Sequence, residues 1–213
     1  MTPLILAVDT TGAHGSLALT RGGETVEEMA ISAPTGFAQV LYGCIRDLLE
    51  RNRVTVSDIS CFASASGPGT FTGVRVGLAC VKGLAEATGK PAAAVSNLEA
   101  LARFGRAPLR APVLDARRGD IYCAVYDEAG SIVVPEAVAK AATWAASLPP
   151  GVEFVAMDWT GLESLPESPR VTAPRELAAM IARIAMSREW QDPAALDANY
   201  VRRSDAELHW KEE

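Results

Sequence analysis

Residues 64–77 read SASGPGTFTGVRVG, a glycine-rich turn between a short apolar run and a long run with helical spacing. Gly67, Gly69 and Gly73 allow positive φ angles and close backbone approach, whereas Pro68 fixes its own φ and removes one amide hydrogen. The stretch predicts a strand-loop-helix unit whose loop can cradle an anion at the start of the helix. An equally good alternative is that the glycines only permit tight packing.

The spacing of these glycines differs from that of two common phosphate-binding motifs. It is Gly-x-Gly-x-x-x-Gly, not the Gly-x-Gly-x-x-Gly of a dinucleotide site, and it lacks the Lys-Ser or Lys-Thr pair that closes a P-loop. Neither Rossmann nor Walker chemistry is predicted, so the rest of the chain has to decide.

Composition predicts a globular protein of one large domain or two half-size ones, because 49% of the 213 residues are hydrophobic. No apolar run approaches the ~18 residues of a membrane span, and the N-terminus lacks the basic region of a signal peptide. We therefore expect a cytoplasmic protein with no membrane contact. The net charge of −6 argues against a chain that grips nucleic acid alone.

Cysteine and histidine usage predicts no metal site. The cysteines are far apart and form no Cys-x-x-Cys pair, and the two histidines lie at opposite ends of the chain. These residues are Cys44, Cys61, Cys80, Cys123, His14 and His209.

Before the glycine-rich loop, the pattern predicts three antiparallel strands and a helix. The strands are expected at 4–8, 15–19 and 25–31, the helix at about 36–52, and a fourth strand at 59–63. After the loop, a second helix should end at Gly89, and a strand follows at 91–95. Asn97 can cap a third helix over 98–104, and residues 105–112 have the composition of a linker.

The second half of the chain weakly repeats the first. In both halves a strand ends in an aspartate, Asp9 or Asp115, and a hairpin follows. The later segments, including the Ala-rich stretch 137–147 and a helix over 174–187, alternate strand and helix in order. We therefore predict an α/β protein with two similar lobes, residues 1–108 and 109–213.

Four motifs resemble the bacterial TsaB (YeaZ) family. They are Asp9-Thr10-Thr11, the glycine-rich stretch 67–77, Lys82-Gly-Leu-Ala, and the stretch 115–122 that reads DARRGDIY. The match covers roughly the first 127 residues, and beyond them it rests on the order of elements and on the tail residues 200–203, YVRR. The glycine-rich motif is the most specific of the four.

The resemblance implies a duplicated actin-like fold of the sugar-kinase and Hsp70 superfamily (ASKHA, ribonuclease-H-like). It also implies a role in making threonylcarbamoyladenosine beside the anticodon of tRNA. In that family TsaB is a non-catalytic scaffold, TsaD transfers the threonylcarbamoyl group, and the ATPase TsaE is a third member. The expected partners are thus a TsaD-type subunit, a TsaE-type ATPase and, indirectly, tRNA, and the chain itself is expected to be no enzyme.

The residues agree with this expectation. The catalytic relative needs a His-x-x-x-His metal pair on its first helix, and residues 36–39 here read GFAQ. No catalytic residue, no metal and no required cofactor is therefore predicted, although ADP or ATP can be expected near the subunit contact. The alternative function is an independent small-molecule kinase or ATPase with the same fold. The second hairpin argues against it, because Ala116, Arg117 and Arg118 stand where such an ATPase places glycines.

Actin-like folds hold phosphates at the hairpins that follow the first strand of each lobe. The candidate residues of this nucleotide cleft, expected to be vestigial, are Asp9, Thr10, Thr11, Gly67, Gly69 and Asp115. Asp9 has two interpretations, a ligand of a magnesium-bound water or a carboxylate that caps the turn at Thr11 or Gly12, of which we favour the cap. Arg117 and Arg118 can bind an anion, form salt bridges or face solvent.

Members of the family associate through their first two helices. The expected interface residues are Leu41, Ile45, Leu48, Gly73, Val74, Gly77 and Val81. The alternative is that these stripes are buried within their own lobe. We expect a homodimer through the same helices when the partner is absent.

Overall fold

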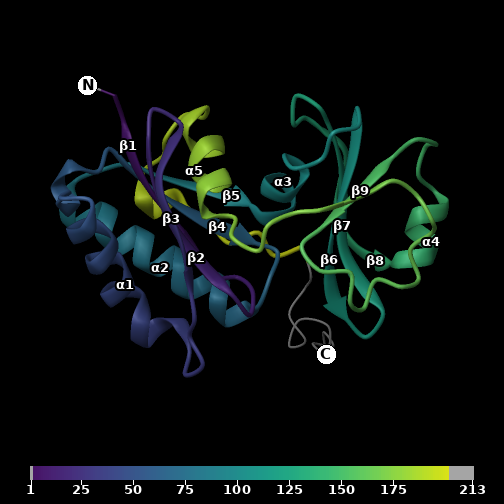
Figure 1. Cartoon of the computed structure of the whole chain (residues 1–213), viewed down its shortest axis with the longest axis horizontal. Helices are drawn as coiled ribbons and strands as arrows, with labels where there is room; N and C mark the ends of the chain where they lie inside the picture. Colours follow the sequence, from purple (N-terminus) through teal and green to yellow (C-terminus); the bar gives the residue numbers. More distant parts are fainter. Residues whose placement is uncertain (1, 202–213) are drawn as a thin grey trace, which may run out of the picture. The chain divides into compact units, whose positions relative to one another are not determined.

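The computed structural model describes residues 2–201 and forms two compact units (Figure 1). Of the described residues, unit 1 contains 2–100 and 174–198, and unit 2 contains 101–173 and 199–201. Each unit is built on one five-stranded mixed sheet.

The sheet of unit 1 has the order β3-β2-β1-β4-β5. Its strands are β1 (Leu4–Asp9), β2 (Gly15–Arg21), β3 (Glu24–Ile31), β4 (Cys61–Gly67) and β5 (Ala92–Ser96). The first three are antiparallel neighbours, as predicted, and β4 and β5 continue the sheet in parallel with β1. Every residue of β1 is buried, because the central strand of such a sheet is covered by helices on both faces.

Helices cover the two faces of this sheet (Figure 1). On one face lie α1 (Phe37–Arg51) and α2 (Phe71–Thr88), and on the other lies α5 (Ala178–Met186). The stripe Leu41, Ile45 and Leu48 of α1 joins the core beneath the first face. As predicted, α2 ends at Gly89, whose φ of 64° is left-handed and leaves its N–H free to bond carbonyls of the last helical turn.

The helix α5 belongs to unit 1, although it lies far along the sequence. Its N-terminal amides are satisfied by the sheet: the Ser16 Oγ accepts from the N–H groups of Leu177 and Ala178, at 3.2 and 3.1 Å, and Glu28 accepts from Ala179 at 2.7 Å. The predicted second lobe of residues 109–213 therefore differs from unit 2 at residues 174–198, and also at residues 101–108, which belong to unit 2. Burial of the apolar sides of α5 against β1 and β2 explains this return of the chain.

Unit 2 repeats the topology of unit 1. Its strands are β6 (Leu109–Arg117), β7 (Asp120–Asp127), β8 (Ile132–Lys140), β9 (Glu153–Ala156) and β10 (Arg170–Thr172), in the order β10-β9-β6-β7-β8. Read from β8, this order is β8-β7-β6-β9-β10, so β6 to β10 occupy the same places in their sheet as β1 to β5 do in theirs. The predicted duplicated fold of two similar lobes is therefore confirmed. One short helix, α4 (Ala141–Ala146), covers the core, where Trp144 packs against Phe154.

Three local expectations were wrong. The Ala-rich stretch 137–147 is not one element, because β8 runs to Lys140 before α4 begins. Part of the expected linker 105–112 is the first half of β6, the central strand of unit 2. The helix α3 (Asn97–Ala102) is capped by Ser96, whose Oγ accepts from the N–H of Leu98, so Asn97 is free for another role.

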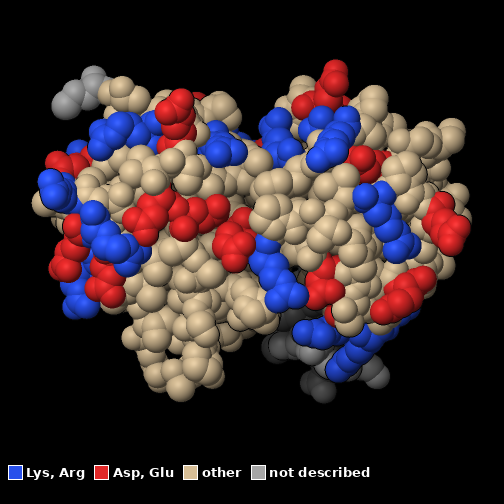
Figure 2. Space-filling view, in the orientation of Figure 1, with Lys and Arg blue, Asp and Glu red and all other residues tan. Residues whose placement is uncertain are grey.

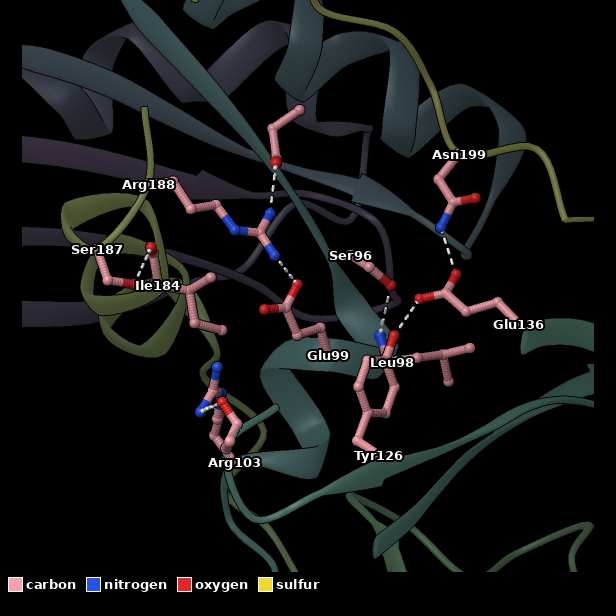
Figure 3. A network of polar contacts seen from close by, with 12 residues as sticks. Ser96, Leu98, Glu99, Arg103, Tyr126, Glu136, Ile184, Ser187, Arg188 and Asn199 are labelled. Carbon is pink, nitrogen blue, oxygen red and sulfur yellow. Dashed lines mark hydrogen bonds and ion pairs between the residues drawn. The ribbon is translucent and has the colours of Figure 1, made fainter. Parts of the chain in front are cut away.

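Polar contacts hold the chain around α3 and the C-terminal segment (Figure 3). In unit 1, Arg188 forms an ion pair with the nearly buried Glu99 of α3. In unit 2, Glu136 of β8 accepts hydrogen bonds from the Tyr126 hydroxyl and from the side chain of Asn199. The tail residues after Val201, on which part of the family resemblance rests, lie outside the described residues. Over residues 2–201, no helix is both long and apolar enough to span a bilayer.

Candidate functional site

The candidate site of unit 1 lies where β1, β4 and β5 end, because the carboxyl ends of parallel strands meet at one edge of a sheet. Asp9 stands at the end of β1 and is only 4% exposed. Its Oδ1 accepts from the backbone N–H of Thr11 at 2.9 Å and from the Thr11 hydroxyl at 2.7 Å. The structure thus shows the turn-capping interaction that was the favoured interpretation.

Burial controls the protonation of this carboxyl. Removal from water disfavours the charged form and raises the pKa of Asp9, while hydrogen bonds from Thr11 and Asn97 oppose that rise. Both hydrogen bonds from Thr11 go to Oδ1, and Oδ2 accepts the longer contact from Asn97 at 3.4 Å.

Asn97 is the residue that sequence reasoning missed. Its Nδ2 donates to the Thr11 hydroxyl at 2.8 Å and reaches Asp9 Oδ2 at 3.4 Å, while its Oδ1 accepts from the N–H of Gly67 at 3.1 Å. This buried amide therefore links the ends of β1 and β4. The signal that could have identified it is its position, since Asn97 directly follows β5 and must fall at the same edge as Asp9.

The glycine-rich loop packs against the turn that follows β1. The Thr70 N–H donates to the carbonyl of Thr11 at 2.7 Å, and the Thr10 hydroxyl donates to the carbonyl of Gly73 at 2.7 Å. The Thr70 side chain also caps α2 by accepting from the N–H of Gly73. Added Cβ atoms on the loop and helix glycines would contact the same turn, at 2.6 Å from Thr11 for Gly69 and 2.0 Å from the Thr10 carbonyl oxygen for Gly73. Gly69 and Gly73 are therefore tightly packed against the turn.

The predicted interface residues of α1 and α2 are not at the surface. All seven are buried inside unit 1: Leu41, Ile45, Leu48, Gly73, Val74, Gly77 and Val81. Helical periodicity identified residues that share a face, but that face meets the sheet. The exposed side of these helices instead carries Tyr42 and Phe71, with 57% and 51% of their surface accessible, and the guanidinium of Arg75 lies 3.6 Å from the centre of the Phe71 ring.

The corresponding hairpin of unit 2 contains Asp115, Arg117 and Arg118. The Oδ1 of Asp115 accepts from the backbone N–H of Arg117 at 2.8 Å, and the Arg117 guanidinium lies 3.4 Å from its Oδ2. The other side of this carboxyl faces Gly161, whose added Cβ would lie 3.3 Å from it. Asp9, Thr10, Thr11, Gly67 and Gly69 therefore come together in unit 1, while Asp115 caps the equivalent turn of unit 2.

Among residues 2–201, no three histidine, cysteine or acidic side chains form a group able to hold a metal ion. The four cysteines are free thiols. Burial raises the pKa of Cys61 and Cys123 to about 12 and that of Cys80 to about 11, so these thiols stay protonated at neutral pH.

The two sheets, their common strand order and the aspartate-capped first turns define an actin-like (ASKHA) protein. The fold alone is shared with component A of (R)-2-hydroxyglutaryl-CoA dehydratase from Acidaminococcus fermentans. The TM-score is 0.54 at 11% identity, over 88% of this chain and 100% of that one.

Sequence comparison gives the family. Residues 32–189 match the family model described as TsaD, tRNA N6-adenosine threonylcarbamoyltransferase. The chain is 30% identical over 228 residues to the tRNA threonylcarbamoyladenosine biosynthesis protein TsaB of Bacillus subtilis, with 98% of each chain covered. The structure of YeaZ from Pseudomonas aeruginosa matches with a TM-score of 0.78 at 26% identity, over 93% of this chain and 99% of that one. The chain belongs to the TsaB (YeaZ) family of tRNA threonylcarbamoyladenosine biosynthesis.

We expect Gly73→Ala to destabilise unit 1, because its Cβ would lie 2.0 Å from a backbone oxygen that cannot move aside. Such overpacking typically costs about 1–3 kcal/mol in the free energy of unfolding, measured by urea denaturation. The matched control is Gly83→Ala on the same helix, where the nearest atom is the Tyr42 hydroxyl at 3.9 Å. That control should gain up to about 1 kcal/mol from helix propensity, and equal effects of the two variants would contradict the packing described here.

We expect Asp9→Asn to change how stability depends on pH. Because the folded-state pKa of Asp9 lies above its ordinary value of 3.8, the folded protein holds this proton more tightly than the unfolded chain does. The free energy of unfolding of the wild type, relative to the variant, should therefore fall as pH rises from about 4, until the raised folded pKa is passed. Urea denaturation at a series of pH values measures this difference.

The control for this pH series is Asp58→Asn, which should show the opposite sign. Hydrogen bonds from Thr55 lower the pKa of Asp58, so the wild type should gain stability relative to that variant as pH rises. The same sign for both variants would contradict the burial effect at Asp9.

Proposed function

We propose that the chain is a non-catalytic scaffold subunit that binds and activates a TsaD-type threonylcarbamoyltransferase. The modified base is the adenosine adjacent to the anticodon of tRNA, and a TsaE-type ATPase is the third protein. The proposal rests on one observation, the alignment with TsaB of Bacillus subtilis over 98% of both chains. The proposal includes a cytoplasmic location, because the tRNA that the complex modifies is in the cytoplasm.

The environment of Asp9 supports a role without catalysis. In an actin-like ATPase this carboxylate would bind water at a metal ion, whereas here it accepts two hydrogen bonds from Thr11 and lies beside Asn97. Thr11 occupies the space beside Gly69, and Thr10 occupies the space beside Gly73. These contacts favour a scaffold that requires no cofactor over the alternative of an independent kinase or ATPase.

The outer side of α1 and α2 supports a protein partner. Residues 32–45 contain no charged side chain, and between Phe71 and Val81 the single charge is Arg75, which stacks on Phe71. Figure 2 shows the same feature as a tan area, free of blue and red, at the lower end of unit 1, where α1 and α2 begin in Figure 1. Depletion of charge and exposed aromatic side chains are typical of interface centres. We therefore place the TsaD-type partner, and a second copy of this chain in its absence, around Tyr42 and Phe71.

Reconstitution tests the function directly. The assay measures threonine incorporation into an unmodified tRNA transcript by the other biosynthesis proteins, with the TsaD-type and TsaE-type proteins among them, in the presence of ATP and bicarbonate. We expect incorporation to depend on this chain. Incorporation that proceeds equally without the chain, together with ATP hydrolysis by the isolated chain, would establish the kinase or ATPase alternative instead.

A second test addresses the proposed contact. We expect Tyr42→Asp combined with Phe71→Asp to weaken association with the TsaD-type subunit at least about tenfold, since a charge placed in an apolar interface centre must lose its water. Analytical ultracentrifugation and isothermal titration calorimetry measure the loss. The matched control is Val26→Asp, a side chain of similar exposure that belongs to β3 and not to either helix. Unchanged association of the double variant would exclude this surface.

A further inference from the structure

The tip of the β6–β7 hairpin has an unusual backbone for its residue types. Arg117, Arg118 and Gly119 all have positive φ, at 68°, 58° and 74°. Two-residue hairpin turns with positive φ at both central positions favour Asn-Gly, and non-glycine residues with positive φ are uncommon. The chain thus places two arginines where asparagine or glycine would adopt the backbone more readily.

The charges around this tip are arranged with acids inside and cations outside. The acids Asp115 and Asp120 have side chains only 28% and 17% exposed, each in an ion pair. Their partners Arg117 and Lys140 are 86% and 63% exposed. Lys140 is also fixed to the tip by donating to the carbonyl oxygen of Arg118 at 3.1 Å.

Three cations therefore project from a surface whose acids are shielded. Figure 2 shows blue side chains at the lower end of unit 2, where β6 and β7 meet in Figure 1. The three cations outnumber the two partly buried acids, so the tip is locally positive on a chain with a net charge of −6.

The shape and polarity of the tip select the kind of ligand. A hairpin tip is convex, whereas small-molecule sites are concave and mostly apolar. The exposed apolar side chains on the same sheet, Ile132 and Val133, are at the opposite end of β8. A contact made through charge alone, with guanidinium groups that match phosphate geometry, is typical of a nucleic-acid backbone.

We propose that Arg117, Arg118 and Lys140 contact the phosphate backbone of the RNA substrate. This inference rests on the proposed function, since it assigns the RNA to be tRNA in the assembled complex. It departs from the sequence expectation that tRNA contact is only indirect. The hairpin supplies a sequence-independent part of RNA affinity, because phosphate contacts position a duplex or loop without reading its bases.

The test uses the wild-type and variant chains in mixture with the TsaD-type and TsaE-type proteins and a fluorescein-labelled, unmodified tRNA transcript. The variant is Arg117→Asn with Arg118→Asn, because asparagine accepts positive φ better than arginine and the hairpin should therefore persist. The control is Arg21→Asn with Arg53→Asn, which removes two exposed arginines of unit 1, one of them, Arg53, also at a positive φ of 54°. A second control, Arg117→Lys with Arg118→Lys, keeps the charge.

We expect the asparagine variant to lower tRNA affinity about fivefold to tenfold, and the slope of log K against log salt to fall by about 1.5–2 for two lost phosphate contacts. The unit 1 control should match the wild type, and the lysine variant should retain the salt slope. Fluorescence anisotropy at about 50 to 200 mM KCl measures both quantities.

Equal affinity and equal salt slope for wild type and asparagine variant would overturn the inference. Loss of binding to the TsaD-type subunit with unchanged tRNA affinity would also overturn it, in favour of an acidic protein partner for the tip. The proposed function is tested by a different measurement: it is contradicted if the wild-type chain does not support threonine incorporation. If incorporation depends on the wild-type chain but the tip variant binds tRNA normally, only the hairpin inference fails.

Discussion

The contact between the Thr10–Thr11 turn and the start of α2 leaves no room for a side chain at Gly69 or Gly73. The Thr70 N–H and the Thr10 hydroxyl each make a 2.7 Å hydrogen bond across it, and a Cβ on Gly73 would overlap a backbone oxygen. Because α2 starts at this contact, the contact also sets the rotation of the helix. Val74 and Val81 consequently face the sheet, and Phe71 faces outward. The partner surface proposed for α1 and α2 therefore follows from a packing constraint at the end of β1.

The same contact accounts for the state of Asp9. In open α/β sheets, ligands bind beyond the carboxyl ends of the parallel strands, which is where Asp9, Gly67 and Asn97 lie. Here these polar groups satisfy one another, and the carboxyl is buried with a raised pKa. A buried acid is tolerated only when its hydrogen bonds are made, and here Thr11 makes the two short ones and Asn97 the long one. The motif residues thus have a structural role that is independent of any bound nucleotide.

Much of this architecture could be predicted from the sequence, for identifiable reasons. The spacing of hydrophobic residues predicts the strands of unit 1 and the helices α1 and α2, and Gly89 predicts the end of α2. The repeated pattern of strand, aspartate and hairpin indicated the duplication. The place of α5 could not be predicted, because its return to β1 is a tertiary event. Asn97 was misassigned because a capping residue and a strand-end ligand have the same local sequence. The helical spacing of hydrophobic residues also showed that Ile45 and Val81 lie on apolar helix faces. It could not show that those faces pack against the sheet.

The two units differ most in what they expose. Unit 1 presents an uncharged end of α1 and α2 with Tyr42 and Phe71, and unit 2 presents a cationic hairpin tip with its acids shielded. These surfaces respond to salt in opposite ways, because added salt screens ion contacts while some salts strengthen apolar burial. A scaffold with both would hold its protein partner through the first surface and leave the second to a polyanion whose binding weakens as salt rises. The two units therefore share the order of their strands but differ in the helices that connect those strands. The full helices α1 and α2 follow β3 and β4 of unit 1, whereas in unit 2 the short helix α4 follows β8 and residues 157–169, between β9 and β10, contain no helix.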